Sequence, residues 1–210
     1  MKLFLLVISL SFALEAASQT QNPIALHHTL MAQAINKCDA PTAKKLLNTP
    51  YVDPDDMLNP HESFLGYAAG GGCQEIVQLL LDKGAHVTLL TDNQTALFIA
   101  VLGSQPTTLK LLLDALQKAT SSPTEFKSYL NLRSTWPDPQ NGFTLLRQVP
   151  EGLGHPDAWL AEVTLLIEAG ADPNITDNGG HTVLFRLRYL PSPPPQVPAV
   201  IQYLVAHGAQ

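Results

Sequence analysis

The sequence is poor in charge and in cysteine, and each shortage excludes a class of protein. Only 14% of the 210 residues are charged and 45% are hydrophobic, which excludes a disordered tail. The 12 lysines and arginines form no cluster and the net charge is −6, which excludes nucleic acid and an anionic membrane surface as partners. Two cysteines are too few for a disulfide-rich scaffold or a cysteine-rich zinc site.

Catalytic and cofactor motifs are missing as well. The sequence contains no G-x-S-x-G, H-E-x-x-H or C-x-x-C pattern, and its seven histidines are scattered. The run Gly70-Gly71-Gly72 follows a predicted helix and has no Lys-Ser or Lys-Thr after it, so we interpret it as a turn between helices. We therefore expect no catalytic residue, no metal site and no cofactor.

The N-terminus has the pattern of a secretory signal peptide. An uncharged run at residues 3–14 follows Lys2, and the small residues Ala16, Ala17 and Ser18 come after Glu15. We predict a signal peptide at 1–18, and hence a protein that is periplasmic in a Gram-negative cell and otherwise secreted. The run spans about 18 Å, short of a hydrocarbon core of about 30 Å, so we expect no membrane insertion after cleavage.

A repeated pattern organises the rest of the chain. An apolar phrase that ends in Gly-Ala recurs at 75–85, 161–171 and 199–209, and each copy predicts an amphipathic helix that is terminated by glycine. A shorter apolar phrase, opened by a hydroxyl residue suited to a helix N-cap, precedes each longer one. These openings are at Thr29, Ser63, Thr95, Thr144 and Thr182. Each unit is thus predicted as turn, short helix, turn, longer helix.

These phrases resemble the ankyrin repeat, with its T-P-L-H-x-A pattern and its later L-L-L-x-x-G-A. Residues 63–89 match without a gap, although no unit keeps the proline or the histidine of the first pattern. Gly66, Phe98, Arg147 and Phe185 stand in the histidine slot. The resemblance implies an all-α, ankyrin-type helix-turn-helix solenoid of about five repeats over residues 27–210. The expected units are 29–58, 59–92, 93–140, 141–178 and 179–210.

Three segments interrupt the regular period. Residues 117–141 form a long stretch between the third and fourth units, which we read as a connection. Residues 150–157 and the proline-rich residues 191–198 lengthen the inter-helix loops of the last two units. An alternative function, an enzyme that uses the atypical 117–160 region, would place Trp136, His155, Asp157 and Trp159 around its site.

The resemblance implies a non-enzymatic protein-binding module that holds, stabilises or inhibits a protein partner outside the cytoplasm. An immunity protein that neutralises an exported toxin is a variant of this function. Binding residues are expected on the concave face and at the turn tips of such a stack. By their offset from each opening hydroxyl residue, these are Glu62, Asp92, Gln94, Leu102, Asn141, Phe143, Asn178 and His181.

Cys38 and Cys73 lie one repeat apart, in the turns between paired helices. Stacked helices are about 8–10 Å apart, whereas a disulfide needs Cα atoms within about 7 Å. Export makes oxidation available. The sequence leaves both outcomes open, a disulfide or two free thiols.

Overall fold

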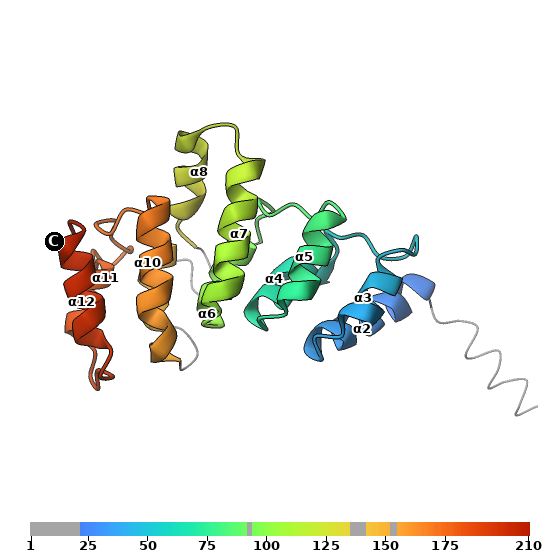
Figure 1. Ribbon diagram of the computed structural model, residues 1–210, viewed down its shortest axis with the longest axis horizontal. Coiled ribbons are helices and arrows are strands. Elements are labelled where there is room, and N and C mark those ends of the chain that lie inside the picture. The colour runs from blue at the N-terminus through green and yellow to red at the C-terminus, as the bar shows by residue number, and fades with distance from the viewer. Residues whose placement is uncertain (1–21, 92–93, 135–141, 152–154) are drawn as a thin grey trace, which may run out of the picture.

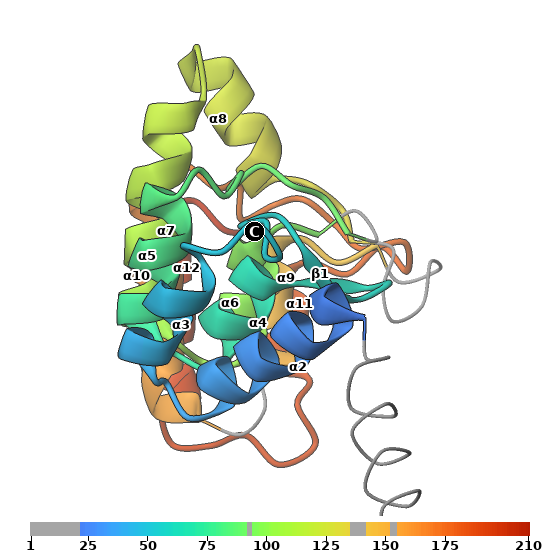
Figure 2. The ribbon, with the colours of Figure 1, turned by 90° about the vertical axis from the view of Figure 1, so that its right-hand side faces the viewer.

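The structure, a computed structural model, is a stack of helix pairs in two layers and describes residues 22–91, 94–134, 142–151 and 155–210 (Figures 1 and 2). The inner layer holds the first helix of each pair: α2 (Pro23–Asn36), α4 (Phe64–Gly70), α6 (Ala96–Leu102), α9 (Leu145–Gln148) and α11 (Val183–Arg188). The outer layer holds the second: α3 (Ala40–Leu46), α5 (Gln74–Asp82), α7 (Pro106–Ala119), α10 (Trp159–Ala169) and α12 (Val197–Ala206). We number these pairs units 1 to 5.

The turn within each of the first three units has one conformation, which shows that the units are true repeats. Cys38, Gly72 and Ser104 take equivalent places and all have a positive φ, of 48°, 69° and 53°. Each donates its backbone N–H to the carbonyl three residues earlier, and the next residue donates to the carbonyl five residues earlier. Glycine adopts this conformation at little cost, whereas Cys38 and Ser104 are held in it by the surrounding stack.

The outer helices α5, α10 and α12 are followed by glycine, as the sequence predicts. Gly84, Gly170 and Gly208 have φ values of 99°, 99° and 90°, the left-handed conformation of a helix C-cap. After each glycine, an alanine N–H donates to a leucine carbonyl five residues earlier, at 2.9–3.0 Å. These turns close the carbonyl ends of the three helices in the same way.

The hydrophobic core runs between the two layers along the whole stack. Leu80, Leu112, Leu166 and Leu204 take one equivalent position on the outer helices of units 2 to 5, and all are fully buried. Small side chains such as Ala68 and Ala100 are also fully buried, because the inner helices of neighbouring units lie close together. No unit could bury its apolar face alone, so the units stabilise one another.

The N-caps agree with prediction in three units and differ in two. Ser63, Thr144 and Thr182 each accept a hydrogen bond from the backbone N–H three residues later. Thr95 occupies the N-cap of α6 without such a bond. Thr29 does not open a helix: α2 begins at Pro23 with Asn22 as its cap, and the Thr29 hydroxyl donates to the Ala25 carbonyl. The preceding Asn-Pro pair is the stronger start signal.

Several small elements interrupt the regular stack. The stretch predicted as a connection contains a further helix, α8 (Pro123–Leu130), which stands beside α7 (Figure 1). Two 3-10 turns, η1 (Val149–Glu151) and η2 (Pro156–Ala158), lie between α9 and α10. The strands β1 (Met57–Asn59) and β2 (Glu62–Ser63) pair antiparallel ahead of α4.

The predicted signal peptide, residues 1–18, lies outside the described residues. Within the described part of the chain, none of the helices has the length and apolar character that crossing a membrane requires.

Candidate functional site

Units 4 and 5 are joined by a network of four charged side chains. The buried Arg147 of α9 donates from Nε to Asp177 Oδ2 at 3.1 Å and from Nη1 to Glu151 Oε1 at 2.9 Å. Arg186 of α11 donates from Nε to the same Glu151 oxygen at 2.7 Å. The Phe143 ring lies 4.3 Å from the Arg147 guanidinium carbon, within the range of a cation–π contact.

The network keeps both of its carboxylates ionised. Burial tends to raise the pKa of Asp177, but the His181 backbone N–H and the charge of Arg147 outweigh it and hold that pKa below its ordinary value. Burial opposes ionisation of Glu151 in the same way, and hydrogen bonds from Arg186 and Arg147 hold its pKa low. The network is therefore an ordered, charge-balanced support beneath the inner surface of units 4 and 5.

A row of exposed rings lies beside this support. His181 precedes the N-cap of α11, Phe185 lies within the helix and Tyr189 is its C-cap, and the spacing of four residues places neighbouring rings side by side. The ring centroids are 4.5 Å apart for His181 and Phe185 and 4.6 Å apart for Phe185 and Tyr189. Phe185 is 43% exposed and Tyr189 is 67% exposed. We call these three residues the aromatic row.

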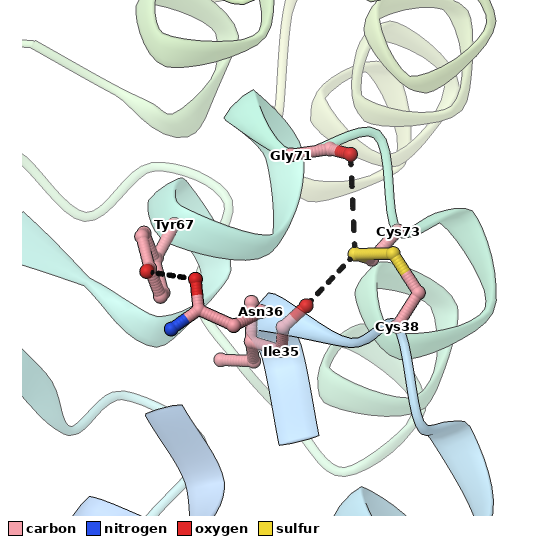
Figure 3. Close-up of a disulfide and its surroundings, with 6 residues drawn as sticks. All are labelled: Ile35, Asn36, Cys38, Tyr67, Gly71 and Cys73. Atoms are coloured by element: carbon pink, nitrogen blue, oxygen red, sulfur yellow. Dashed lines mark hydrogen bonds between the residues drawn. A yellow bond between two sulfur atoms is a disulfide. The ribbon is translucent and has the colours of Figure 1, made fainter. Parts of the chain in front are cut away.

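A second candidate surface lies at the junction of units 1, 2 and 3. A hollow of about 270 Å³ there is lined by Glu62, Tyr67, Ile99, Leu102 and both cysteines, among others. Burial raises the pKa of the Glu62 carboxyl, which accepts a hydrogen bond of 3.4 Å from the Asn59 amide. The Tyr67 hydroxyl donates to Asn36 Oδ1 and so connects α4 to the end of α2 (Figure 3).

Cys38 and Cys73 are joined by a disulfide at the edge of this hollow (Figure 3). Their Cα atoms are 5.1 Å apart, closer than stacked helices, because the two residues are not at the same repeat position. Cys38 in unit 1 is equivalent to Gly72 in unit 2, and the disulfide joins Cys38 to Cys73, the residue after Gly72. The bond therefore crosses diagonally from one unit to the next. Cys73 Sγ lies 3.1 Å from the Ile35 carbonyl oxygen, a close contact without a proton, since a disulfide sulfur has none to donate.

Comparison with known families agrees with this geometry. Residues 30–122 match the family model for ankyrin repeats, in three copies. This part of the chain belongs to the ankyrin-repeat family. No curated protein matches it. The matched residues include units 2 and 3, and the equivalent glycine-ended helices of units 4 and 5 extend the same architecture to the C-terminus.

The ankyrin fold places three of the predicted binding residues around the Arg147 network. Phe143 packs against Arg147, and its carbonyl accepts a hydrogen bond of 2.8 Å from the Ser134 N–H. Asn178 is exposed and accepts from Arg133 Nη1 at 3.1 Å. The His181 side chain is 45% exposed and lies 3.5 Å from Asp177. These residues share one end of the stack, whereas Glu62 and Leu102 line the hollow in the other half.

One predicted binding residue is corrected by the structure. Gln94 is only 5% exposed, and its amide donates to Ser134 Oγ at 2.6 Å. Its backbone also pairs with Thr91 in a β-bridge. Gln94 therefore ties the turn of unit 3 to the segment that leads into unit 4 and is not available to a partner. Asp92 and Asn141 lie outside the described residues.

The prediction missed Phe185, Tyr189 and Arg186, although a signal for the first two was present. Rings recur every four residues at His181, Phe185 and Tyr189, along the short helix that is predicted to open at Thr182. The sequence placed Phe185 only in the histidine slot of the repeat.

The described residues that the enzyme alternative would use differ in burial and do not share one surface. His155 and Asp157 are exposed, and the Asp157 carboxylate accepts a hydrogen bond from Gln196. Trp159 is 5% exposed, so it does not share a surface with them. Trp136 lies outside the described residues. Within the described part of the chain, no group of three or more His, Cys, Asp or Glu side chains could hold a metal ion.

Proposed function

We propose that this chain is a non-enzymatic module that binds a protein partner through the exposed face of α11 and the neighbouring turns. Ankyrin repeats generally mediate protein–protein interaction. The aromatic row carries the proposal, because exposed rings beside an ordered arginine network are the side chains that dominate binding energy in protein interfaces. The partner would be held, stabilised or inhibited; no chemistry on it is required.

The ionic network supports this proposal by preorganising the surface. The aromatic row extends from a helix whose Arg186 is fixed by Glu151, and whose preceding turn is fixed by hydrogen bonds to Asp177. A surface held in place before binding loses less conformational entropy when a partner docks. This favours recognition by the end of the stack over recognition by a loose loop.

We further propose that the module acts outside the cytoplasm, after removal of residues 1–18. The Cys38–Cys73 disulfide supports this location, because structural disulfides persist mainly in oxidising compartments. Alkylation of the protein isolated from the exported fraction, before and after reduction, tests it. Two reactive thiols before reduction, or retention of residues 1–18 in a cytosolic product, would contradict the proposal.

Affinity capture from the exported fraction tests the binding function, if it is run with three tagged proteins in parallel. Wild type and a Leu160→Ala control, in which an apolar side chain is removed from an exposed site on α10, should recover the same stoichiometric protein. A double variant, Phe185→Ala with Tyr189→Ala, should lose it. Equal recovery by all three would show that the aromatic row is not the binding surface, and turnover of a substrate by the purified protein would refute the non-enzymatic assignment.

A further inference from the structure

A carboxylate is buried in the middle of the outer layer. Glu162 of α10 is fully buried, and neither of its carboxylate oxygens has a hydrogen-bond partner among the residues that the structure describes. It lies four residues before Leu166, the equivalent core position of unit 4. The same place is taken by Ile76 in unit 2, Thr108 in unit 3 and Val200 in unit 5, all buried. Glu162 therefore occupies a position that the neighbouring units fill with uncharged side chains.

The two helices that flank α10 give this carboxylate no compensating charge. Helix α7 packs against one side of α10 and α12 packs against the other. At the equivalent position of α7, the Thr108 hydroxyl is buried and also has no hydrogen-bond partner in the described part of the chain. At the equivalent position of α12, Val200 is apolar. The indole N–H of Trp159, three residues before Glu162 on α10, likewise has no partner within the described ranges.

The charged and titratable groups on every element packed against α10 are directed elsewhere. On α7, Lys110 pairs with Asp114 at 2.9 Å, and Lys118 is exposed. On α9 and η1, Arg147 and Glu151 bind each other. Lys127 of α8 is exposed and lies beside Gly170, at the C-terminal end of α10 and eight residues beyond Glu162. The remaining groups are the exposed His155 and Asp157 at η2, and Tyr203 of α12, which stacks on His207. Among the described residues, therefore, no cation lies within ion-pair distance of Glu162.

A carboxyl group in such a place is stable in its neutral form. Burial raises the pKa of Glu162 to about 8. In the unfolded chain the same group ionises near its ordinary value of 4.5. Between these two pH values the folded protein holds a proton that the unfolded protein has released, so stability falls as the pH rises through this range.

We propose that Glu162 makes the closure of the junction between α7, α10 and α12 dependent on pH. With the carboxyl protonated, the junction stays closed and keeps Glu162 fully buried. When the proton is lost, the buried charge favours opening at this junction, which admits water to the carboxylate. Because the junction lies between the disulfide-linked units and the aromatic row, it divides the stack into an N-terminal and a C-terminal part.

Urea unfolding of three purified proteins between pH 5 and 9 tests the first step. The unfolding constant of wild type should rise relative to Glu162→Gln by close to tenfold per pH unit from about pH 5 to pH 8, and then level off. The control Glu168→Gln removes an exposed carboxylate from the same helix and should follow wild type. A wild type to Glu162→Gln ratio that is independent of pH would overturn the proposal.

Two further measurements cover a variant that fails to fold and locate the opening. If Glu162→Gln does not fold, Glu162→Val replaces it, because unit 5 has a valine, Val200, at the equivalent position. In a Trp136→Phe background, Trp159 is the single tryptophan, and its emission should shift to longer wavelength between pH 7 and 9 only when Glu162 is present. Emission that stays constant over this range would refute the opening. Carbon NMR of the protein with labelled glutamate follows the carboxyl groups directly. A carboxyl signal that titrates above pH 7 in wild type and is missing from Glu162→Val supports the proposal. If wild type has no such signal, the proposal is overturned.

Discussion

The Cys38–Cys73 disulfide should contribute strongly to stability because it closes a long loop. The bond spans a sequence separation of 35 residues. The chain-entropy relation for a loop of this length gives about 4 kcal/mol, which corresponds to nearly three powers of ten in the unfolding constant. Replacing both cysteines, Cys38→Ser with Cys73→Ser, should lower the free energy of unfolding by that amount if the stack unfolds as one cooperative unit.

The position of the disulfide also predicts which units should lose the most stability without it. The bond joins only units 1 and 2, and stability in a repeat stack is a sum over units and their interfaces. Hydrogen exchange should therefore accelerate first in α2 and α3 and least in α10 and α12. Urea unfolding of the double variant, and of wild type with and without reductant, measures the total.

Two observations would refute this reasoning. One is an unfolding midpoint that does not move although both thiols of the reduced protein react with an alkylating agent, since loop closure would then have no effect. The other is accelerated exchange that is uniform over the five units. Wild type treated with the alkylating agent before reduction is the control, and it should gain no mass.

Three further predictions concern the unit junctions. Replacing the buried Arg147 by Met should lower the free energy of unfolding by about 3–5 kcal/mol, because it leaves Asp177 buried without its cation; urea unfolding measures this. Since the pKa of Asp177 is held low, the stabilisation is present above about pH 4 and lost as the pH falls further, so wild type and this variant should converge in acid unfolding. Gly72 and Gln105 make the same diagonal contact as the two cysteines, because a Cβ at Gly72 would collide with the Gln105 amide. Replacing both by Cys should give a second disulfide, detected by mass before and after reduction.

The regular part of the fold was predictable because each repeated element has a local cause. A glycine after a predicted helix and a hydroxyl residue before one end or begin the helix through contacts within a few residues. The structure has these helix ends at Gly84 and Gly170 and these helix starts at Ser63 and Thr182. Helix α8 was missed although its signal was just as local. Ser122 and Glu125 have the spacing of a capping box, and Pro123 stands at the first helical position. Ser122 accepts from the Glu125 N–H, and the Glu125 carboxylate accepts from the N–H of Ser121, the residue before the N-cap.

The candidate site was less predictable because its residues meet through the stacking of units. Nothing near Arg147 in the sequence identifies Asp177, 30 residues away, as its partner. Gln94 and Ser134, 40 residues apart, are likewise joined only when unit 4 docks on unit 3. A position before a helix in a turn is solvent-facing by default, and Gln94 departs from that default because a following segment covers it.

One slot of the repeat shows that the place in the stack decides the role of a side chain. The slot three residues after the N-cap holds Phe98 in unit 3 and Phe185 in unit 5. Phe98 is 1% exposed because α9 packs on α6, whereas Phe185 is 43% exposed because no described helix covers that face of α11. Phe98→Ala should therefore lower the free energy of unfolding by about 3–5 kcal/mol, as a core truncation does. Phe185→Ala should leave the urea midpoint near that of wild type and lower partner binding, because a docked partner would cover Phe185 as unit 4 covers Phe98. A large stability loss from Phe185→Ala would mean that the ring supports the fold and is not a free contact surface.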